Sequence, residues 1–196
     1  LLWRDPQGQI SLAVTTLFWG AGATLRLVVL TWAGLILKFD VERATQLTAV
    51  VALGIAVGAV VAGKFVTLEK SVKVLPTGIL MGFTVMSMIL VNDWRIAVAL
   101  LFVIGALGGF FVVPMNALLQ HRGHLLMGAG HSIAVQNFNE NISILLLLGC
   151  YAMMVKSGMH INTITVVFGA FVSLSMWLIN HHYKRVASSE HDRPVW

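Results

Sequence analysis

The sequence is poor in charged residues and in cysteine. Only 11% of its 196 residues are charged, whereas 58% are hydrophobic, and the mean hydropathy is +0.85. A soluble globular domain typically has about 25% charged residues, so the composition excludes that class. Cys150 is the single cysteine and lies within an apolar run, which excludes a disulfide framework and a thiolate metal cluster. The composition therefore indicates a membrane protein.

Sequence motifs of common enzyme and nucleic-acid sites are also missing. The sequence has no Gly-rich phosphate loop, nucleophile elbow or HExxH, and its one His-Asp pair, His191 with Asp192, lies in a polar tail. No carboxylate or cysteine accompanies His121, His124 and His131 at the spacing of a metal site. The net charge is +5, but the basic residues lie at the ends of apolar runs and not in a stripe. We expect no enzyme, no metal or other cofactor and no nucleic-acid partner.

Six apolar runs are long enough to cross the ~30 Å hydrocarbon core of a bilayer as helices. The second run has Gly54, Gly58 and Ala62 at four-residue intervals, and such a row of small residues lets another helix approach closely. We predict an N-terminal cytoplasmic segment over 1–10, a six-helix transmembrane domain over 11–180 and a cytoplasmic polar tail over 181–196. The predicted spans are 11–37, 45–68, 74–91, 96–119, 128–155 and 161–180.

Lysine and arginine are distributed unevenly between the ends of these spans. Eight lie in the N-terminal segment, the 64–73 stretch, the 120–127 loop and the tail, namely Arg4, Lys64, Lys70, Lys73, Arg122, Lys184, Arg185 and Arg193. Four lie in the alternate loops, namely Lys38, Arg43, Arg95 and Lys156. Cytoplasmic loops carry the excess of basic residues, so we expect both termini in the cytoplasm.

Two spans carry polar side chains at positions where hydrocarbon would surround them. The fifth has a carboxylate and four amides between residues 136 and 141, and the first has Arg26, the one basic residue that belongs to no loop. A central charge costs roughly 2.5 to 3.5 kcal/mol on insertion scales, so such groups usually face a bundle interior, a partner or a water-filled cavity. We predict that the substrate-binding residues are Arg26, Asn116, Gln136, Asn137 and Glu140.

Arg26 and Glu140 lie near the centres of their predicted spans, which predicts similar depths in the membrane. One interpretation is an ion pair that fixes how the two helices pack. In the other, both line a substrate route, where Arg26 offers a forked donor to a phosphate and Glu140 attracts a cation. Both interpretations hold if the pair exchanges partners as a substrate moves.

Four runs resemble a known family of membrane transporters. They are LFWGAGATLRLVVLTW (17–32), ALGIAVGAVVAGKFVTLE (52–69), GGFFVVPMNALLQ (108–120) and GAGHSIAVQNFNEN (128–141), and they are similar to the C-terminal half of bacterial lysophospholipid transporters of the major facilitator superfamily. The resemblance covers most of residues 11–180. It implies an all-α membrane protein whose six transmembrane helices are helices seven to twelve of the full transporter. The loop GKFVTLEKSVK is a degraded version of the superfamily signature, and His131 stands where we expect Asn.

The resemblance implies movement of lysophospholipids, such as lysophosphatidylethanolamine, from the outer to the inner leaflet of the bacterial inner membrane by alternating access. There an acyltransferase partner would re-acylate them, and the N-terminal half would be a further partner. The first residues show neither an initiator Met nor a signal peptide, so we expect a piece of a longer chain. The first, second, fourth and fifth spans are expected to border the substrate cavity of the transporter. The third and sixth spans, which contain Gly82 and Val172, are expected to face lipid.

Two alternative functions stay open. One is a major facilitator transporter of another amphiphile or of a drug, since a fold does not fix function. The other is a membrane scaffold fragment that transports nothing. Loss of lysolipid uptake with retained drug efflux would favour the first, and independence from an N-terminal half would favour the second.

Overall fold

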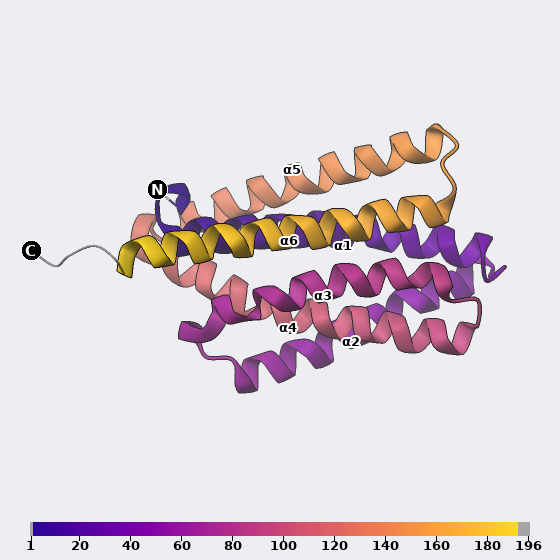
Figure 1. Cartoon of the computed structure of the whole chain (residues 1–196), viewed down its shortest axis with the longest axis horizontal. Helices are drawn as coiled ribbons and strands as arrows, with labels where there is room; N and C mark the ends of the chain where they lie inside the picture. Colours follow the sequence, from indigo (N-terminus) through magenta and orange to yellow (C-terminus); the bar gives the residue numbers. More distant parts are fainter. Residues whose placement is uncertain (1, 192–196) are drawn as a thin grey trace, which may run out of the picture.

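The computed structural model describes residues 2–191 and contains only helices and their connections within that range (Figure 1). The long helices are α1 (Pro6–Leu35), α2 (Val41–Phe65), α3 (Leu75–Met86), α4 (Trp94–Met127), α5 (Ala129–Lys156) and α6 (Ile161–His191), and the short 3-10 helices are η1 (Leu2–Arg4), η2 (Leu68–Val74) and η3 (Ser87–Leu90). Six segments are long and apolar enough to cross a membrane, with η2, α3 and η3 together forming the third. The prediction of an all-α, multi-pass membrane protein is confirmed.

A capping residue explains why α1 begins earlier than predicted. The carboxylate of Asp5 accepts a hydrogen bond from the backbone N–H of Gly8 at 2.7 Å, and Pro6 occupies the first turn. The helix thus starts five residues before the predicted position 11, and much of the expected segment 1–10 is helical. Because the midpoint of the helix moves with its start, Arg26 lies ~8 Å beyond the middle of α1 on helical rise.

Two helices also end later than predicted. α4 continues through Pro114 to Met127, where the expected span ended at 119, and it stops at Gly128, whose φ of 82° favours glycine. α6 continues to His191, so residues 181–191 of the expected polar tail are helical. Residues 192–196 of that tail lie outside the described part of the chain.

The helices associate mainly in three pairs, α2 with α4, α3 with α6 and α1 with α5. Each pair joins a helix from the first half of the chain to one from the second. α1 and α4 also contact each other and carry many of the fully buried side chains, among them Trp32, Phe111 and Met115. α5 lies at one edge of the bundle and α2 at the opposite edge (Figure 1), and these two spans are the least buried of the six.

Glycines allow α2 and α4 to pack backbone against backbone. A Cβ on Gly54 or Gly58 would overlap carbonyl oxygens of α4, and a Cβ on Gly105 or Gly109 would overlap carbonyl oxygens of α2. The spacing of Gly54, Gly58 and Ala62 predicts such an approach. The close contact between α2 and α4 confirms it.

The expected lipid exposure of the third and sixth spans is wrong for the faces on which these helices meet. Val172 is 1% exposed, and a Cβ on Gly82 would come within 2.7 Å of the backbone of α6. Other faces of α3 and α6 are open, as Phe83 and Trp177 show. Each helix therefore buries one side in the bundle and exposes another. A prediction that treats the whole helix as facing lipid does not separate these two sides.

Candidate substrate-binding site

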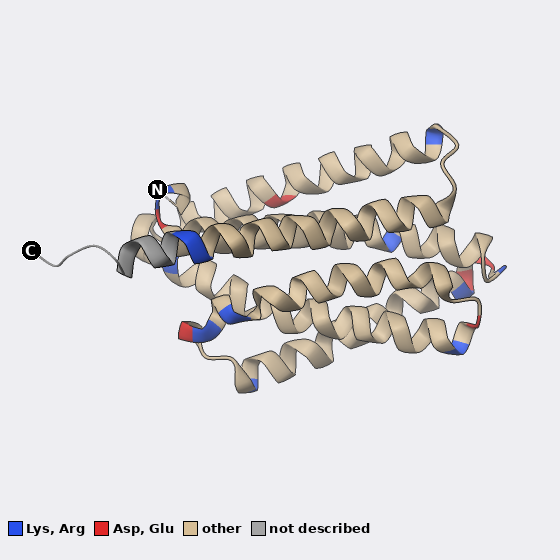
Figure 2. Ribbon diagram, in the orientation of Figure 1, with Lys and Arg blue, Asp and Glu red and all other residues tan. Residues whose placement is uncertain are grey.

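Charged residues lie mostly toward the two ends of the helices, and few lie in their middle parts (Figure 2). Among the residues that the structure describes, Arg26 on α1 and Glu140 on α5 are the charged groups that lie well inside a span. Charges at such depth are costly in hydrocarbon and mark candidate functional positions.

A groove of about 390 Å³ lies between α1 and α2, and Arg26 is the charged residue among those lining it. The volume falls within the range of small-molecule sites. The rim is exposed and comes from α1 and α2, at Gly22, Arg26, Thr45, Ala49 and Ala52. The floor is buried and comes from α3, α4 and α6, at Met81, Val85, Ile104, Gly105, Gly108, Phe168 and Val172.

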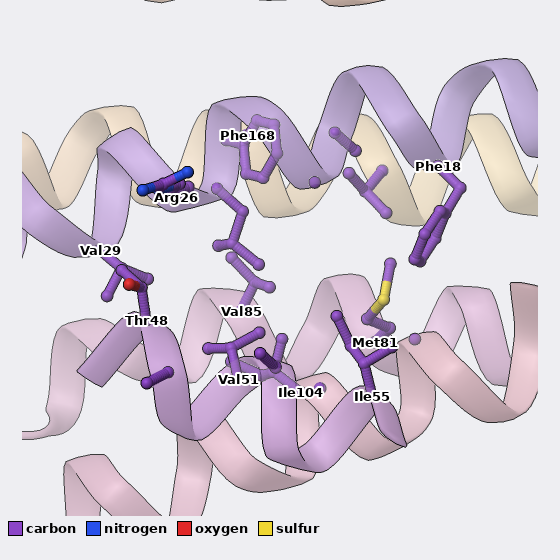
Figure 3. Close-up of a pocket in the computed structure, with 18 of the residues that line it drawn as sticks. Phe18, Arg26, Val29, Thr48, Val51, Ile55, Met81, Val85, Ile104 and Phe168 are labelled. Carbon is purple, nitrogen blue, oxygen red and sulfur yellow. The ribbon is translucent and has the colours of Figure 1, made fainter. Parts of the chain in front are cut away.

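The groove has a polar end and an apolar end. Figure 3 shows Arg26 and Thr48 toward one end, and Phe18, Met81 and Ile55 toward the other. Thr45 lies one turn before Thr48, and both threonine hydroxyls donate 2.7 Å hydrogen bonds to backbone carbonyls of α2, which leaves lone pairs on the oxygens as acceptors. The groove can therefore hold a molecule with a charged head and an apolar tail.

Three of the predicted binding residues meet in a second polar cluster, between α4 and α5. The side-chain amide of Gln136 donates to the carbonyl oxygen of Asn116 at 3.2 Å and to the carboxylate of Glu140 at 2.7 Å. Asn137 does not join them, because its side chain is exposed and its backbone carbonyl accepts a bond from Asn141. The structure thus brings together Asn116, Gln136 and Glu140.

The ion pair between Arg26 and Glu140, one of the two interpretations of these charges, does not form among the described residues. Arg26 lines the groove between α1 and α2, whereas Glu140 lies on α5 and accepts its hydrogen bond from Gln136. The ion pair that does form in the described part of the chain joins Arg122 to Asp5. The interpretation that an Arg26–Glu140 pair fixes helix packing is therefore wrong.

The predicted equal depth of Arg26 and Glu140 is wrong as well. Gly20 of α1 lies against Ser143 of α5, and Thr31 forms a 2.7 Å hydrogen bond with Tyr151. α1 and α5 therefore run in the same direction, and Glu140 is level with about residue 17 of α1. The nine residues between that level and Arg26 correspond to ~14 Å along the helix.

The ion pair of Asp5 with Arg122 ties the start of α1 to the end of α4. Arg122 Nε donates to one carboxylate oxygen of Asp5 at 2.9 Å, and a terminal guanidinium nitrogen donates to the other oxygen. These bonds lower the pKa of Asp5 below its ordinary value of 3.8, although burial acts in the opposite direction. The pair secures the end of the bundle nearer to Glu140.

Sequence reasoning missed two hydroxyl groups and the apolar floor of the groove. Thr45 and Thr48 are three residues apart and so lie on one face of α2. This spacing of two hydroxyl groups near the start of the second span could have indicated a polar patch. No comparable signal marks Met81, Val85 or Phe168, because apolar residues within an apolar span look alike. In the described residues, no group of three His, Cys, Asp or Glu side chains is placed to hold a metal ion.

Curated relatives of the chain are transporters. The lysophospholipid transporter LplT of Escherichia coli O127:H6 is 46% identical over 186 residues, which are 93% of this chain and 47% of that protein. LplT of Escherichia coli O1:K1 is 48% identical over 176 residues, which are 89% of this chain and 44% of that protein. No family model and no solved structure matches the chain. The chain is thus homologous to the lysophospholipid transporters named LplT and spans about half the length of the curated relatives it matches.

Proposed function

We propose that this chain is the C-terminal half of a lysophospholipid transporter and supplies one wall of its substrate route. The transporter moves lysophospholipids, such as lysophosphatidylethanolamine, from the outer to the inner leaflet of the bacterial inner membrane by alternating access. The groove between α1 and α2 carries the proposal, because it has one arginine near one end and an apolar floor. A lysophospholipid has the same division into a charged head and a single apolar tail.

The head group is assigned to the polar end of the groove. Arg26 donates its planar fork to the phosphate, a geometry that a lysine ammonium does not reproduce. The hydroxyl oxygens of Thr45 and Thr48 accept from the ammonium of the ethanolamine. The acyl chain lies along the apolar floor, where contacts with buried apolar side chains replace its contacts with bilayer hydrocarbon.

The cluster of Asn116, Gln136 and Glu140 forms a second station on the route, ~14 Å closer to the start of α1. We assign this end of the bundle and both termini to the cytoplasm, which the excess of basic residues in the corresponding loops supports. A head group that enters from the outer leaflet therefore meets Arg26 first and Glu140 later. Asn137, which is exposed on α5, contacts the head group from the open side.

The exposed sides of α2 and α5 are assigned to the N-terminal half of the transporter. Both spans are poorly buried in this chain and carry large exposed apolar side chains, such as Leu53, Leu145 and Leu146. The second half covers these faces and closes the route. On the inner leaflet a separate acyltransferase uses the product, and this chain itself is not an enzyme.

Uptake of labelled lysophosphatidylethanolamine tests the proposal. Spheroplasts that lack their own transporter express this chain with or without the N-terminal half of an LplT relative. We expect uptake only with both halves, reduced about tenfold to hundredfold by Arg26→Ala and by Glu140→Ala, since each removes a charge-assisted bond. Arg95→Ala and Glu69→Ala, which change exposed charges at the bundle ends, should leave uptake intact.

Each other outcome has a distinct meaning. Full uptake in both Arg26→Ala and Glu140→Ala would refute the assigned head-group positions. Export of a drug without uptake of lysolipid would assign the fold to another amphiphile. If the chain binds an acyltransferase but supports no uptake with the N-terminal half, it acts as a scaffold.

A further inference from the structure

We propose that the closed end of the groove, formed by Phe18, Met81 and Gly108, sets the length of the acyl chain that the site accepts. This inference rests on the proposed function, because it assigns the apolar end of the same groove to the tail of a single-chain amphiphile. It adds a basis for selectivity that the charged end cannot provide. Lysophospholipids that share a head group differ only in their tails.

The distance between Arg26 and Phe18 along α1 defines the length of groove available to the tail. Figure 3 places Arg26 toward one end of the groove and Phe18 and Met81 toward the other. Eight residues separate Arg26 from Phe18, which corresponds to ~12 Å along the helix. A tail whose head group is held by Arg26 therefore extends toward Phe18 and Met81.

Packing behind Phe18 closes this end of the groove. Phe18 is 9% exposed, and its ring lies 6.0 Å from the ring of Phe111, measured between centroids. Phe111, Val14 and Met115 belong to the same apolar cluster and are completely buried. Such a close-packed cluster has no room for further methylenes, so a longer tail has to bend out of the groove.

Gly108 lies beside the two side chains that form this end. A Cβ on Gly108 would lie 3.2 Å from the ring of Phe18 and 3.6 Å from the sulfur of Met81. A methyl group there fits with a small adjustment of these side chains and takes space from the tail. Substitutions can therefore lengthen the available space at Phe18 or Met81 and shorten it at Gly108.

Affinity for lipids of different length tests the inference. The purified chain in phosphatidylcholine nanodiscs is first loaded with a fluorescent lysophosphatidylethanolamine. Saturated lysophosphatidylethanolamines of increasing tail length are then added, and the displacement of the fluorescent lipid gives the affinity for each. For the unsubstituted chain, affinity expressed per mole fraction of lipid in the bilayer should stay level while the tail fits the groove and fall for longer tails, because a methylene gains little on moving from bilayer hydrocarbon to an apolar groove. The ratio of variant to unsubstituted affinity for each lipid cancels the partitioning of that lipid into the bilayer.

The three substitutions should move this limit in opposite directions. Phe18→Ala and Met81→Ala should shift it to longer tails, while Gly108→Ala should shift it to shorter ones, a pattern that a general loss of folding cannot produce. Phe83→Ala and Gly63→Ala are matched controls outside the groove, at an exposed ring and at a glycine with open space around it. Both should leave the limit unchanged.

Two outcomes would overturn the inference. Binding with the same length limit in all three variants would show that the closed end does not measure the tail, while the proposed function would stand. Absence of any binding to the unsubstituted chain would also reject the length limit. The uptake experiment with both halves then decides separately whether the proposed function holds.

Discussion

Asp5 has two roles at the start of α1, and substitutions can separate them. Its carboxylate caps the helix through the N–H of Gly8 and also binds the guanidinium of Arg122 on α4. Asp5→Ala removes both interactions. Asp5→Asn keeps a good N-cap and removes the charge, because asparagine caps helices about as well as aspartate. Arg122→Gln removes only the ion pair.

The expected sizes follow from the exposure of the two side chains. Loss of an N-cap costs about 1 kcal/mol. The side chains of Asp5 and Arg122 are 14% and 29% exposed, so solvent screening reduces their pair to about 1 kcal/mol. We expect the free energy of unfolding to fall by about 2 kcal/mol in Asp5→Ala and by about 1 kcal/mol in each of the other variants.

The pH dependence of unfolding provides an independent test. The pKa of Asp5 in the folded chain lies below its ordinary value of 3.8, because Arg122 favours the ionised form. The carboxylate therefore binds its proton more readily in the unfolded chain, and the contribution of the pair is complete above 3.8. This contribution is lost as the pH falls through the lowered pKa, so stability should decrease more in the unsubstituted chain than in Asp5→Asn.

Unfolding in detergent micelles, followed by tryptophan fluorescence, measures these differences. The double variant Asp5→Asn with Arg122→Gln should lose about 1 kcal/mol and not 2, because both substitutions remove the same pair. Glu69→Gln is the control, since Glu69 is exposed. The reasoning fails if Arg122→Gln leaves stability unchanged, or if Asp5→Asn costs as much as Asp5→Ala.

Two further predictions concern the α2–α4 contact and the head-group site. Gly58→Leu should lower the free energy of unfolding by about 3 kcal/mol or more, because the new side chain overlaps the backbone of α4. Gly63→Leu, which enters open space, should unfold at the same denaturant concentration as the unsubstituted chain, and equal loss in both would contradict the proposed packing. Arg26→Lys should reduce lysophosphatidylethanolamine uptake about tenfold but less than Arg26→Ala, since it keeps a charge and loses the fork. Equal uptake in Arg26→Lys and the unsubstituted chain would show that a point charge suffices.

Hydropathy was sufficient to identify six apolar spans, whereas the ends of the helices depend on other features of the sequence. An apolar run long enough for the bilayer is visible in the sequence alone. The start of α1 depends on the cap at Asp5, and the end of α4 depends on the backbone conformation of Gly128. Asp5 precedes the first predicted span, and Gly128 is the first residue of the predicted fifth span, so hydropathy alone does not reveal that α1 begins at Pro6 or that α4 continues to Met127.

The site could be predicted only in part, because the sequence alone gives neither the exact depth of Arg26 and Glu140 along the bundle nor the helices that contact each other. Arg26 and Glu140 were recognisable because a charge within an apolar span is rare. Their pairing was inferred from the centres of the predicted spans, and the early start of α1 invalidates that estimate for Arg26. The contact of Asn116 with Gln136 and the groove between α1 and α2 depend on which helices are neighbours. A single sequence does not reveal this arrangement.

The pairing of α1 with α5, α2 with α4 and α3 with α6 determines when the chain can complete its fold. Each helix of the first three has its main partner among the last three. A nascent chain that has inserted α1, α2 and α3 must therefore keep them in the membrane without these partners. The contact of α2 can form when α4 arrives, and that of α1 when α5 arrives. α3 has to wait for α6, so the six helices form one folding unit that cannot be divided at the loop between α3 and α4.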